Sequence, residues 1–188
     1  SAPVPTKIPT GPIKVGLIGC GGRGTGAAAQ ALQADPDVTL IAMGDAFQDR
    51  LDRSVKNLSE NKKVGDRVDV PLERQFVGLD AYAKVLDEDV DVVILTTPPY
   101  FRPAHLEAAV NAGKHVFCEK PIGIDARQAA EMWSAYRGTD RAHYVPFWTR
   151  YFDGFRKARE VVQAGTLGEI RAFVYRWQNP RPASMPFT

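Results

Sequence analysis

The sequence is poor in cysteine and histidine, and it lacks a long apolar run. Its 188 residues include two cysteines and three histidines. Two cysteines, Cys20 and Cys118, are too few for a disulfide scaffold. Each follows an apolar run, which suits a small buried thiol in a reducing compartment, although exported proteins can also keep free thiols. No apolar run approaches the roughly 20 residues of a membrane-spanning helix. We therefore expect no disulfide framework and no membrane span, and we assign no metal site.

The sequence also lacks an excess of either charge. It has 24 Lys and Arg against 22 Asp and Glu, a formal net charge of +2, with both signs interspersed. The aromatic residues fall mostly within apolar segments rather than between basic residues. A nucleic-acid groove would need a basic stripe or interleaved aromatics, so nucleic acid is not an expected partner.

Residues 13–150 alternate between short apolar runs and helical patterns. This alternation predicts parallel strands joined by right-handed helical crossovers, which is a doubly wound, mostly parallel sheet of the α/β (Rossmann) class. Three of the apolar runs predict strands that are buried on both faces, and a fourth predicts a short strand. The stretch "RQFVG" is a weaker strand candidate. The expected strands are 13–19, 38–43, 74–78, 90–96, 115–118 and 144–147.

The two ends of the chain differ from this pattern. Residues 1–12 hold four prolines and no period, so we expect an extended leader; with no initiating Met and no apolar signal core, the chain was processed or begins late. After Arg150, a helix over 152–164 and an alternating strand over 170–177 predict the start of an α+β second domain. We therefore divide the chain into 1–12, 13–150 and an incomplete domain at 151–188.

The stretch "IGCGGRGTG" (18–26) holds five glycines in nine residues, directly after the first predicted strand. Gly19 would make a tight turn, Gly21 would let a pyrophosphate approach the backbone, and Gly24 would let the helix pack closely on the strand. A glycine-rich turn without a ligand is the alternative, and the strand before and helix after it favour dinucleotide binding. We include Gly22 and Arg23 in the cofactor-binding set.

Asp45 stands at the end of the second predicted strand. A carboxylate there can accept hydrogen bonds from the adenosine ribose hydroxyls and would repel a 2′-phosphate, which favours NAD over NADP. Asp45 and Gln48 also fit a capping box for the next helix, a role compatible with the first. Arg50 could partly offset the repulsion, so NADP is not excluded.

Two later stretches, "TTPPYFRPAH" (96–105) and "AGKHVFCEKP" (112–121), follow the glycine turn in order. Together they resemble the Gfo/Idh/MocA family of pyridine-nucleotide-dependent oxidoreductases, and the resemblance runs from residue 13 to about 177. It implies hydride transfer between nicotinamide and a sugar or polyol hydroxyl or ketone, a carboxy-terminal domain with an open antiparallel sheet, and a homo-oligomeric full-length protein.

The resemblance assigns roles to residues at the fifth strand. Lys120 matches the lysine of the Glu-Lys-Pro motif, and an ammonium at this edge could stabilise the alkoxide-like charge that develops as hydride leaves. Its alternative is an ordinary surface lysine. Glu119 would contact the cofactor ribose or orient Lys120, or simply form an ion pair with it. Pro121 matches a proline that is often cis.

Other matching positions are less specific. Thr97 and Pro98 would lie along the cofactor or merely end a strand. His105 is placed on the cofactor side, where packing or a capping contact is favoured over catalysis. Arg150 and Trp148 are expected to contact substrate or nicotinamide, although Trp148 could instead pack on the second domain.

The resemblance also implies limits. No D-x-x-x-H motif, which the family uses as its second catalytic motif, follows Arg150. We therefore expect cofactor binding with poor turnover from this chain alone. An NAD-dependent glycosidase and a non-catalytic NAD-binding module are the alternatives. The turn with Arg23, Thr25 and Gly26 is closest to a branch that often carries a twin-arginine signal, so the compartment is cytoplasmic, or periplasmic if such a signal was removed.

Overall fold

The computed structural model describes residues 11–174 and residue 176. The chain divides into two compact units, Ser1–Pro146 and Phe147–Thr188, which we describe separately. Of the predicted leader, only Gly11 and Pro12 belong to the described residues. In the described part of the chain, no helix is both long and apolar enough to cross a membrane.

The first unit is built on one six-stranded sheet in which every neighbouring pair is parallel. The strand order is β3-β2-β1-β4-β5-β6, so the order reverses between β1 and β4. This confirms the predicted doubly wound Rossmann sheet. The strands are β1 (Ile13–Ile18), β2 (Val38–Asp45), β3 (Gln75–Val77), β4 (Val92–Leu95), β5 (His115–Cys118) and β6 (His143–Tyr144).

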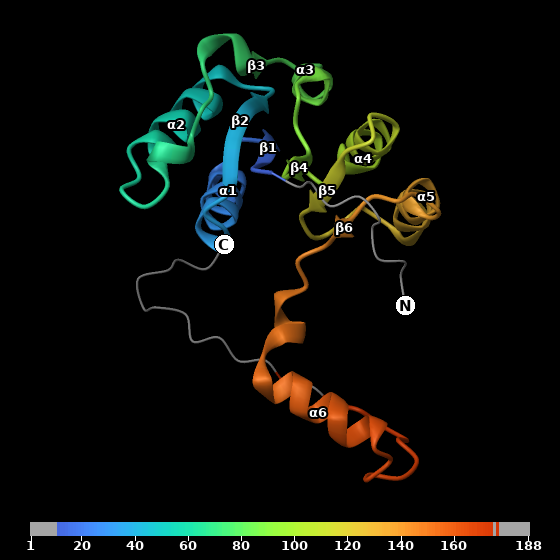
Figure 1. The fold of residues 1–188 in the computed structure, drawn as a ribbon. Coiled ribbons are helices and arrows are strands. Elements are labelled where there is room, and N and C mark those ends of the chain that lie inside the picture. Colours follow the sequence, from blue (N-terminus) through green and yellow to red (C-terminus); the bar gives the residue numbers. More distant parts are fainter. Residues whose placement is uncertain (1–10, 175, 177–188) are drawn as a thin grey trace, which may run out of the picture. The chain divides into compact units, whose positions relative to one another are not determined.

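Five helices cover the two faces of this sheet (Figure 1). Helices α1 and α2 pack on one face, where Leu17 and Leu40 are among the buried core residues. Helices α3, α4 and α5 pack on the other face around Ile18 and Val93. Neighbours Leu17 and Ile18 thus point to opposite cores, which is why these strands read as continuous apolar runs. The helices are α1 (Gly22–Ala34), α2 (Gln48–Ser59), α3 (Ala81–Asp87), α4 (Arg102–Asn111) and α5 (Ala126–Tyr136).

Local sequence signals explain where several helices begin and end. Pro103 stands in the first turn of α4, and Gly113, with φ +69°, follows its end. Asp125 caps α5 by accepting a hydrogen bond from the Gln128 N–H at 2.8 Å. Two short 3-10 turns, η1 (Gly65–Arg67) and η2 (Leu72–Arg74), lie in the polar segment that connects α2 to β3.

The second unit contains the 3-10 turn η3 (Trp148–Tyr151) and helix α6 (Asp153–Gln163). The predicted strand over 170–177 is wrong for residues 170–174 and 176, which have no strand structure, and 175 and 177 lie outside the described residues. An alternating pattern needs a neighbouring strand, and the described residues of this unit supply none. The strand predicted over 144–147 is also shorter, because Pro146 lacks an N–H to extend the ladder.

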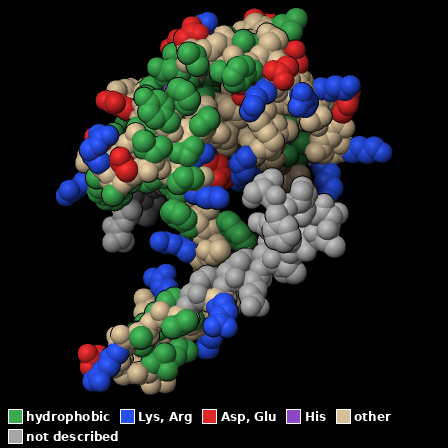
Figure 2. Space-filling model, turned by 180° about the vertical axis from the view of Figure 1, so that it is seen from behind, with side chains coloured by type: hydrophobic (Ala, Val, Ile, Leu, Met, Phe, Trp, Pro, Cys, Tyr) green, Lys and Arg blue, Asp and Glu red, His purple; other side chains and the backbone are tan. Residues whose placement is uncertain are grey.

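The charges of the first unit are mixed, as the sequence predicted. On the face shown in Figure 2, Lys and Arg side chains lie among Asp and Glu side chains rather than in one basic band. Many of the surface charges form short ion pairs along helices, such as Lys84 with Asp80 and Arg127 with Glu131.

Candidate functional site

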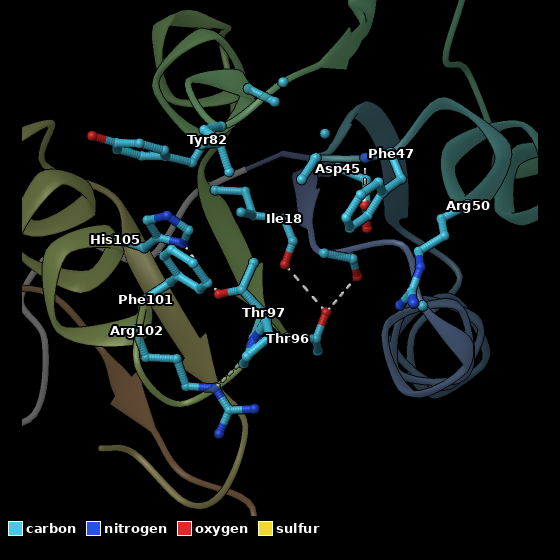
Figure 3. Close-up of a pocket in the computed structure, with 18 residues that line it drawn as sticks. Ile18, Asp45, Phe47, Arg50, Tyr82, Thr96, Thr97, Phe101, Arg102 and His105 are labelled. Carbon is cyan, nitrogen blue, oxygen red and sulfur yellow. Dashed lines mark hydrogen bonds between the residues drawn. The ribbon is translucent and has the colours of Figure 1, made fainter. Parts of the chain in front are cut away.

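The carboxyl ends of β1, β2 and β4 surround a cavity of about 350 Å³ (Figure 3). It lies where the strand order reverses, which is the usual ligand position in an open parallel sheet. Its walls come from the glycine turn, the end of β2, the loop before α3 and the loop after β4. Seven of the predicted site residues line it: Gly19, Gly21, Asp45, Arg50, Thr97, Pro98 and His105.

Two glycines of the turn leave no room for a side chain, whereas a third faces open space. Gly19 has φ +97°, and a Cβ there would stand 2.7 Å from the Thr97 nitrogen. A Cβ on Gly24 would stand 1.9 Å from the Gly19 carbonyl oxygen. At Gly21, by contrast, the nearest atom to such a Cβ is Arg50 Nη1 at 3.7 Å. The backbone is therefore tightly packed on its sheet side and accessible at Gly21, next to the amino end of α1.

Asp45 holds this turn in place. Its Oδ2 accepts a hydrogen bond from the Cys20 N–H at 2.6 Å, and its Oδ1 accepts one from the Phe47 N–H at 3.0 Å. The predicted capping box is wrong, because α2 begins at Gln48 and its cap position is Phe47. Asp45 is the last residue of β2, paired with Val77, and its carboxylate binds the glycine turn through Oδ2 and the residue before α2 through Oδ1.

Cys20 lies behind the turn and is buried. Its thiol donates to the Gly44 carbonyl at 3.4 Å. Burial, together with the negative charge of Asp45, raises the pKa of this thiol well above its usual range. The thiol therefore stays protonated, which is unfavourable for a nucleophile.

Arg50 connects the cavity with a second hollow between α1 and α2. Its guanidinium lies 5.4 Å from the centre of the Phe47 ring. The second hollow, of about 560 Å³, is lined by Gly21 and Gly22 together with Arg50 and Arg53. Arg53 forms an ion pair with Asp49 at 3.6 Å. Arg50 thus provides a positive charge beside the exposed backbone of the glycine turn.

His105 forms part of an aromatic wall on the opposite side of the cavity. Its ring stacks on Tyr82 with centroids 4.2 Å apart, and Phe101 lies 6.1 Å away on a nearly parallel plane. Its Nδ1 is hydrogen-bonded to Thr97 Oγ1 at 3.1 Å. Burial lowers the pKa of His105 to about 4. The imidazole is therefore neutral near pH 7, and its contacts are those of a packing residue.

The low pKa of His105 predicts that the fold loses stability in mild acid. The unfolded chain would bind a proton below pH 6.5 that the folded chain rejects until about pH 4. The free energy of unfolding should therefore decrease as the pH is lowered through this window, by about 3 kcal/mol in total at pH 4. Half-buried His143, whose pKa burial also lowers, acts in the same direction. Urea unfolding from pH 8 to 4 measures this, and His105→Gln should reduce the slope; an unchanged slope would contradict the assignment.

Glu119 pairs with Arg23 rather than with the Lys120 ammonium. Its Oε1 accepts hydrogen bonds from Arg23 Nε at 2.7 Å and faces Arg23 Nη2 at 2.5 Å. Its Oε2 accepts a hydrogen bond from the Lys120 backbone N–H at 3.0 Å. The Lys120–Pro121 peptide is cis, as the resemblance implied. Buried Glu119 thus joins the glycine turn to the end of β5, where Lys120 is exposed.

Two predicted residues lie in the second unit and are described only there. Trp148 packs edge-on against Phe152, with ring centroids 4.7 Å apart. The Arg150 guanidinium lies 5.6 Å from the centre of the Phe147 ring. Their proposed contacts with substrate or nicotinamide stay predictions. In the first unit, His115 has a structural role, because its Nδ1 accepts a hydrogen bond from the Ala142 N–H at 2.8 Å.

Three further residues line the cavity that no sequence pattern had indicated: Tyr82, Phe101 and Arg102. Arg102 is buried at the first position of α4 and donates to backbone carbonyls of two loops. A positive charge at the amino end of a helix opposes the helix dipole. That unfavourable placement, with no acidic residue nearby in the sequence, was the available signal for an unusual role.

Several known proteins are similar to this chain in sequence and in structure. The myo-inositol 2-dehydrogenase of Thermotoga maritima is 27% identical over 175 residues, which are 93% of this chain and 48% of that protein. The scyllo-inositol dehydrogenase of Lactobacillus casei, solved with bound NAD(H) and scyllo-inositol, superposes with a TM-score of 0.63 at 27% identity, covering 84% of this chain and 42% of that one. A 3-ketoreductase from Actinomadura kijaniata in complex with NADP gives 0.62 at 27% identity, over 85% and 46%.

The chain spans about half the length of the curated relatives it matches. Residues 13–147 match the family model described as an oxidoreductase family with an NAD-binding Rossmann fold. This match covers the whole six-stranded sheet and every residue lining the cavity. The chain therefore belongs to the Gfo/Idh/MocA family of oxidoreductases.

Proposed function

We propose that this chain binds NAD or NADP across the carboxyl edge of its sheet, with the pyrophosphate over Gly21. The observation that carries the proposal is the contrast within the glycine turn. Gly19 and Gly24 have no room for a side chain, whereas Gly21 has open space beside the amino end of α1. Backbone N–H groups and the helix dipole favour an anion at such a place.

The described residues suit the other parts of a dinucleotide. Arg50 supplies a positive charge beside Gly21, and the Asp45 carboxylate retains lone pairs after accepting its two backbone hydrogen bonds. Those lone pairs could accept hydrogen bonds from the ribose hydroxyls of the dinucleotide. The apolar wall of Tyr82, Phe101 and His105 suits a flat ring. When bound, the nicotinamide ring would supply the hydride donor or acceptor.

Lys120 is the residue we propose for the reacting oxygen. It follows β5 at the ligand edge, and its side chain is exposed while its backbone is held by Glu119. An ammonium there could donate a hydrogen bond to a substrate hydroxyl and stabilise negative charge on that oxygen. The relatives include inositol dehydrogenases and a sugar reductase, so we propose a sugar or polyol as substrate.

The proposed oxidoreductase activity needs a second catalytic motif in addition to Lys120. We propose that efficient turnover requires a substrate domain carrying the D-x-x-x-H motif. Robust polyol oxidation by these 188 residues alone would contradict this part of the proposal. The homo-oligomeric state and the compartment stay predictions.

Calorimetric titration with NAD and with NADP tests the cofactor proposal and the role of Asp45. We expect NAD to bind more tightly, because the Asp45 carboxylate would repel a 2′-phosphate. Asp45→Ser should weaken NAD binding by roughly tenfold, because about one charge-assisted hydrogen bond is lost. The difference between the affinities for NAD and NADP should become smaller. Asp49→Ser is the matched control, since exposed Asp49 pairs with Arg53 on the same helix. Absence of binding by either dinucleotide would overturn the proposal, whereas tighter NADP binding would overturn only the role of Asp45.

A further inference from the structure

Arg102 connects the two loops that carry the proposed cofactor and lysine sites. Its Nε donates to the Thr97 carbonyl at 2.7 Å, on the loop after β4. Its Nη1 donates to the Glu119 carbonyl at 2.6 Å and also to the Pro121 carbonyl, both on the loop after β5. One guanidinium therefore holds the backbone on each side of Lys120. At the same time it holds the cavity wall at Thr97, beside which Figure 3 shows the Arg102 side chain.

This arrangement depends on a buried positive charge. Arg102 is 6% exposed, and within the described residues no ion pair joins it to a carboxylate. Burial lowers the pKa of the guanidinium, but arginine remains charged at physiological pH. The charge is compensated by three carbonyl dipoles, which the planar fork of arginine can reach together. The ammonium of lysine cannot reproduce that geometry.

We propose that Arg102 is a positioning residue that sets Lys120 relative to the dinucleotide cavity. Glu119 and Pro121 flank Lys120, and the two carbonyl contacts restrain the peptide unit directly before Lys120 and the one directly after Pro121. The Thr97 contact restrains the cavity wall to which His105 is also hydrogen-bonded. The link to cofactor and substrate rests on the proposed function, but the restraint on Lys120 stands on the contacts themselves.

The competing explanation is that Arg102 only stabilises the fold. Arg67 provides a matched comparison, because its guanidinium also binds backbone carbonyls, those of Leu32, Asp35 and Lys63. Leu32 and Asp35 lie at the end of α1 and in its connection to β2, and Lys63 lies between α2 and η1; none of these groups is at the carboxyl edge of the sheet. Replacing Arg67 should therefore report the cost of losing such a contact without an effect on Lys120.

The experiment compares the unmodified chain with Arg102→Gln, Arg102→Lys and Arg67→Gln. Thermal unfolding gives stability, and calorimetry gives the affinities for NAD and for AMP, which lacks the nicotinamide half. Nuclear magnetic resonance follows the Lys120 amide and, after reductive ¹³C-methylation, the Lys120 side chain. We expect Arg102→Gln to weaken NAD binding by about tenfold or more, because the loops after β4 and β5 lose the charged hydrogen bonds that restrain them, and to weaken AMP binding by less than about twofold. The Lys120 signals should shift, and Arg102→Lys should recover part of both effects.

Arg67→Gln should lower the melting temperature while leaving the NAD to AMP affinity ratio and the Lys120 signals unchanged. Unshifted Lys120 signals in both Arg102 variants would overturn the inference, even if both variants were less stable. If Arg102→Gln does not fold, the Lys120 signals of Arg102→Lys decide the question alone. If the unmodified chain binds no NAD, the proposed function fails, and the same Lys120 signals still test the positioning role.

Discussion

Gly24→Ala is expected to destabilise the fold by roughly 3 kcal/mol and to weaken dinucleotide binding at least tenfold. The added Cβ would stand 1.9 Å from the Gly19 carbonyl oxygen and 2.6 Å from Thr96 Oγ1. Gly19 belongs to the turn, and Thr96 Oγ1 itself donates to the Gly19 carbonyl at 2.6 Å. Neither group is a flexible side-chain end, so α1 must move away from the sheet. Chemical denaturation and calorimetry with NAD measure the two effects.

Gly26→Ala is the matched control for this prediction. Gly26 lies in the same helix, and the nearest atom to an added Cβ is Arg23 Nη1 at 3.9 Å, an ordinary contact. Because alanine is the better helix former, this variant should be more stable by up to about 1 kcal/mol. If Gly24→Ala proved as stable as Gly26→Ala, the close packing of α1 on the turn would be disproved.

Arg23→Met is expected to destabilise the protein by about 2–3 kcal/mol, although Arg23 itself is a half-exposed side chain. Its side chain is 48% exposed, whereas that of its partner Glu119 is 4% exposed. Removing the arginine leaves a buried carboxylate whose remaining hydrogen bond, within the described residues, comes from the Lys120 N–H. An uncompensated buried charge is costly, and the partial exposure of the arginine moderates the cost. Urea unfolding of the cofactor-free protein measures the change.

A double-mutant cycle with Glu119→Gln isolates the pair. The doubly substituted protein should be more stable than the two single changes predict together, with a coupling energy of about 1–2 kcal/mol. The exposed pair Arg127–Glu131 has a similar distance, 2.6 Å, with side chains 69% and 53% exposed. Arg127→Met should cost less than about 0.5 kcal/mol. Equal costs at Arg23 and Arg127 would show that burial of Glu119 does not matter.

Most of the fold could be predicted because its signals are local. Apolar runs of strand length, Pro103 and Gly113 at the ends of α4, and the Asp125 cap each depend on a few neighbouring residues. The strand predicted over 170–177 was wrong for the described residues of that range, because strand formation needs a partner, which no local pattern supplies. The cap at Asp45 was wrong for a related reason, since the extent of β2 decides where that side chain points.

The site was predictable only in part. The spacing of Gly19, Gly21 and Gly24 indicates a phosphate turn because three positions on one turn and helix have a determined geometry. The partners of the charged residues could not be read in the same way. Arg23 and Glu119 are separated by 96 residues and Cys20 and Asp45 by 25, so each contact depends on which strands become neighbours.

By itself, the sequence determined the class of sheet, the position of the glycine turn and the placement of Lys120 at the end of a buried strand. These features follow from periodicity and from residue-specific backbone freedom, which act over a few residues. The tertiary structure alone decided that Glu119 pairs with Arg23, that Asp45 holds the turn, and that Arg102 braces the Lys120 loop. Such pairings are decided only when β1, β2, β4 and β5 align, because hydrogen bonds and buried charges require their partners within about 3 Å.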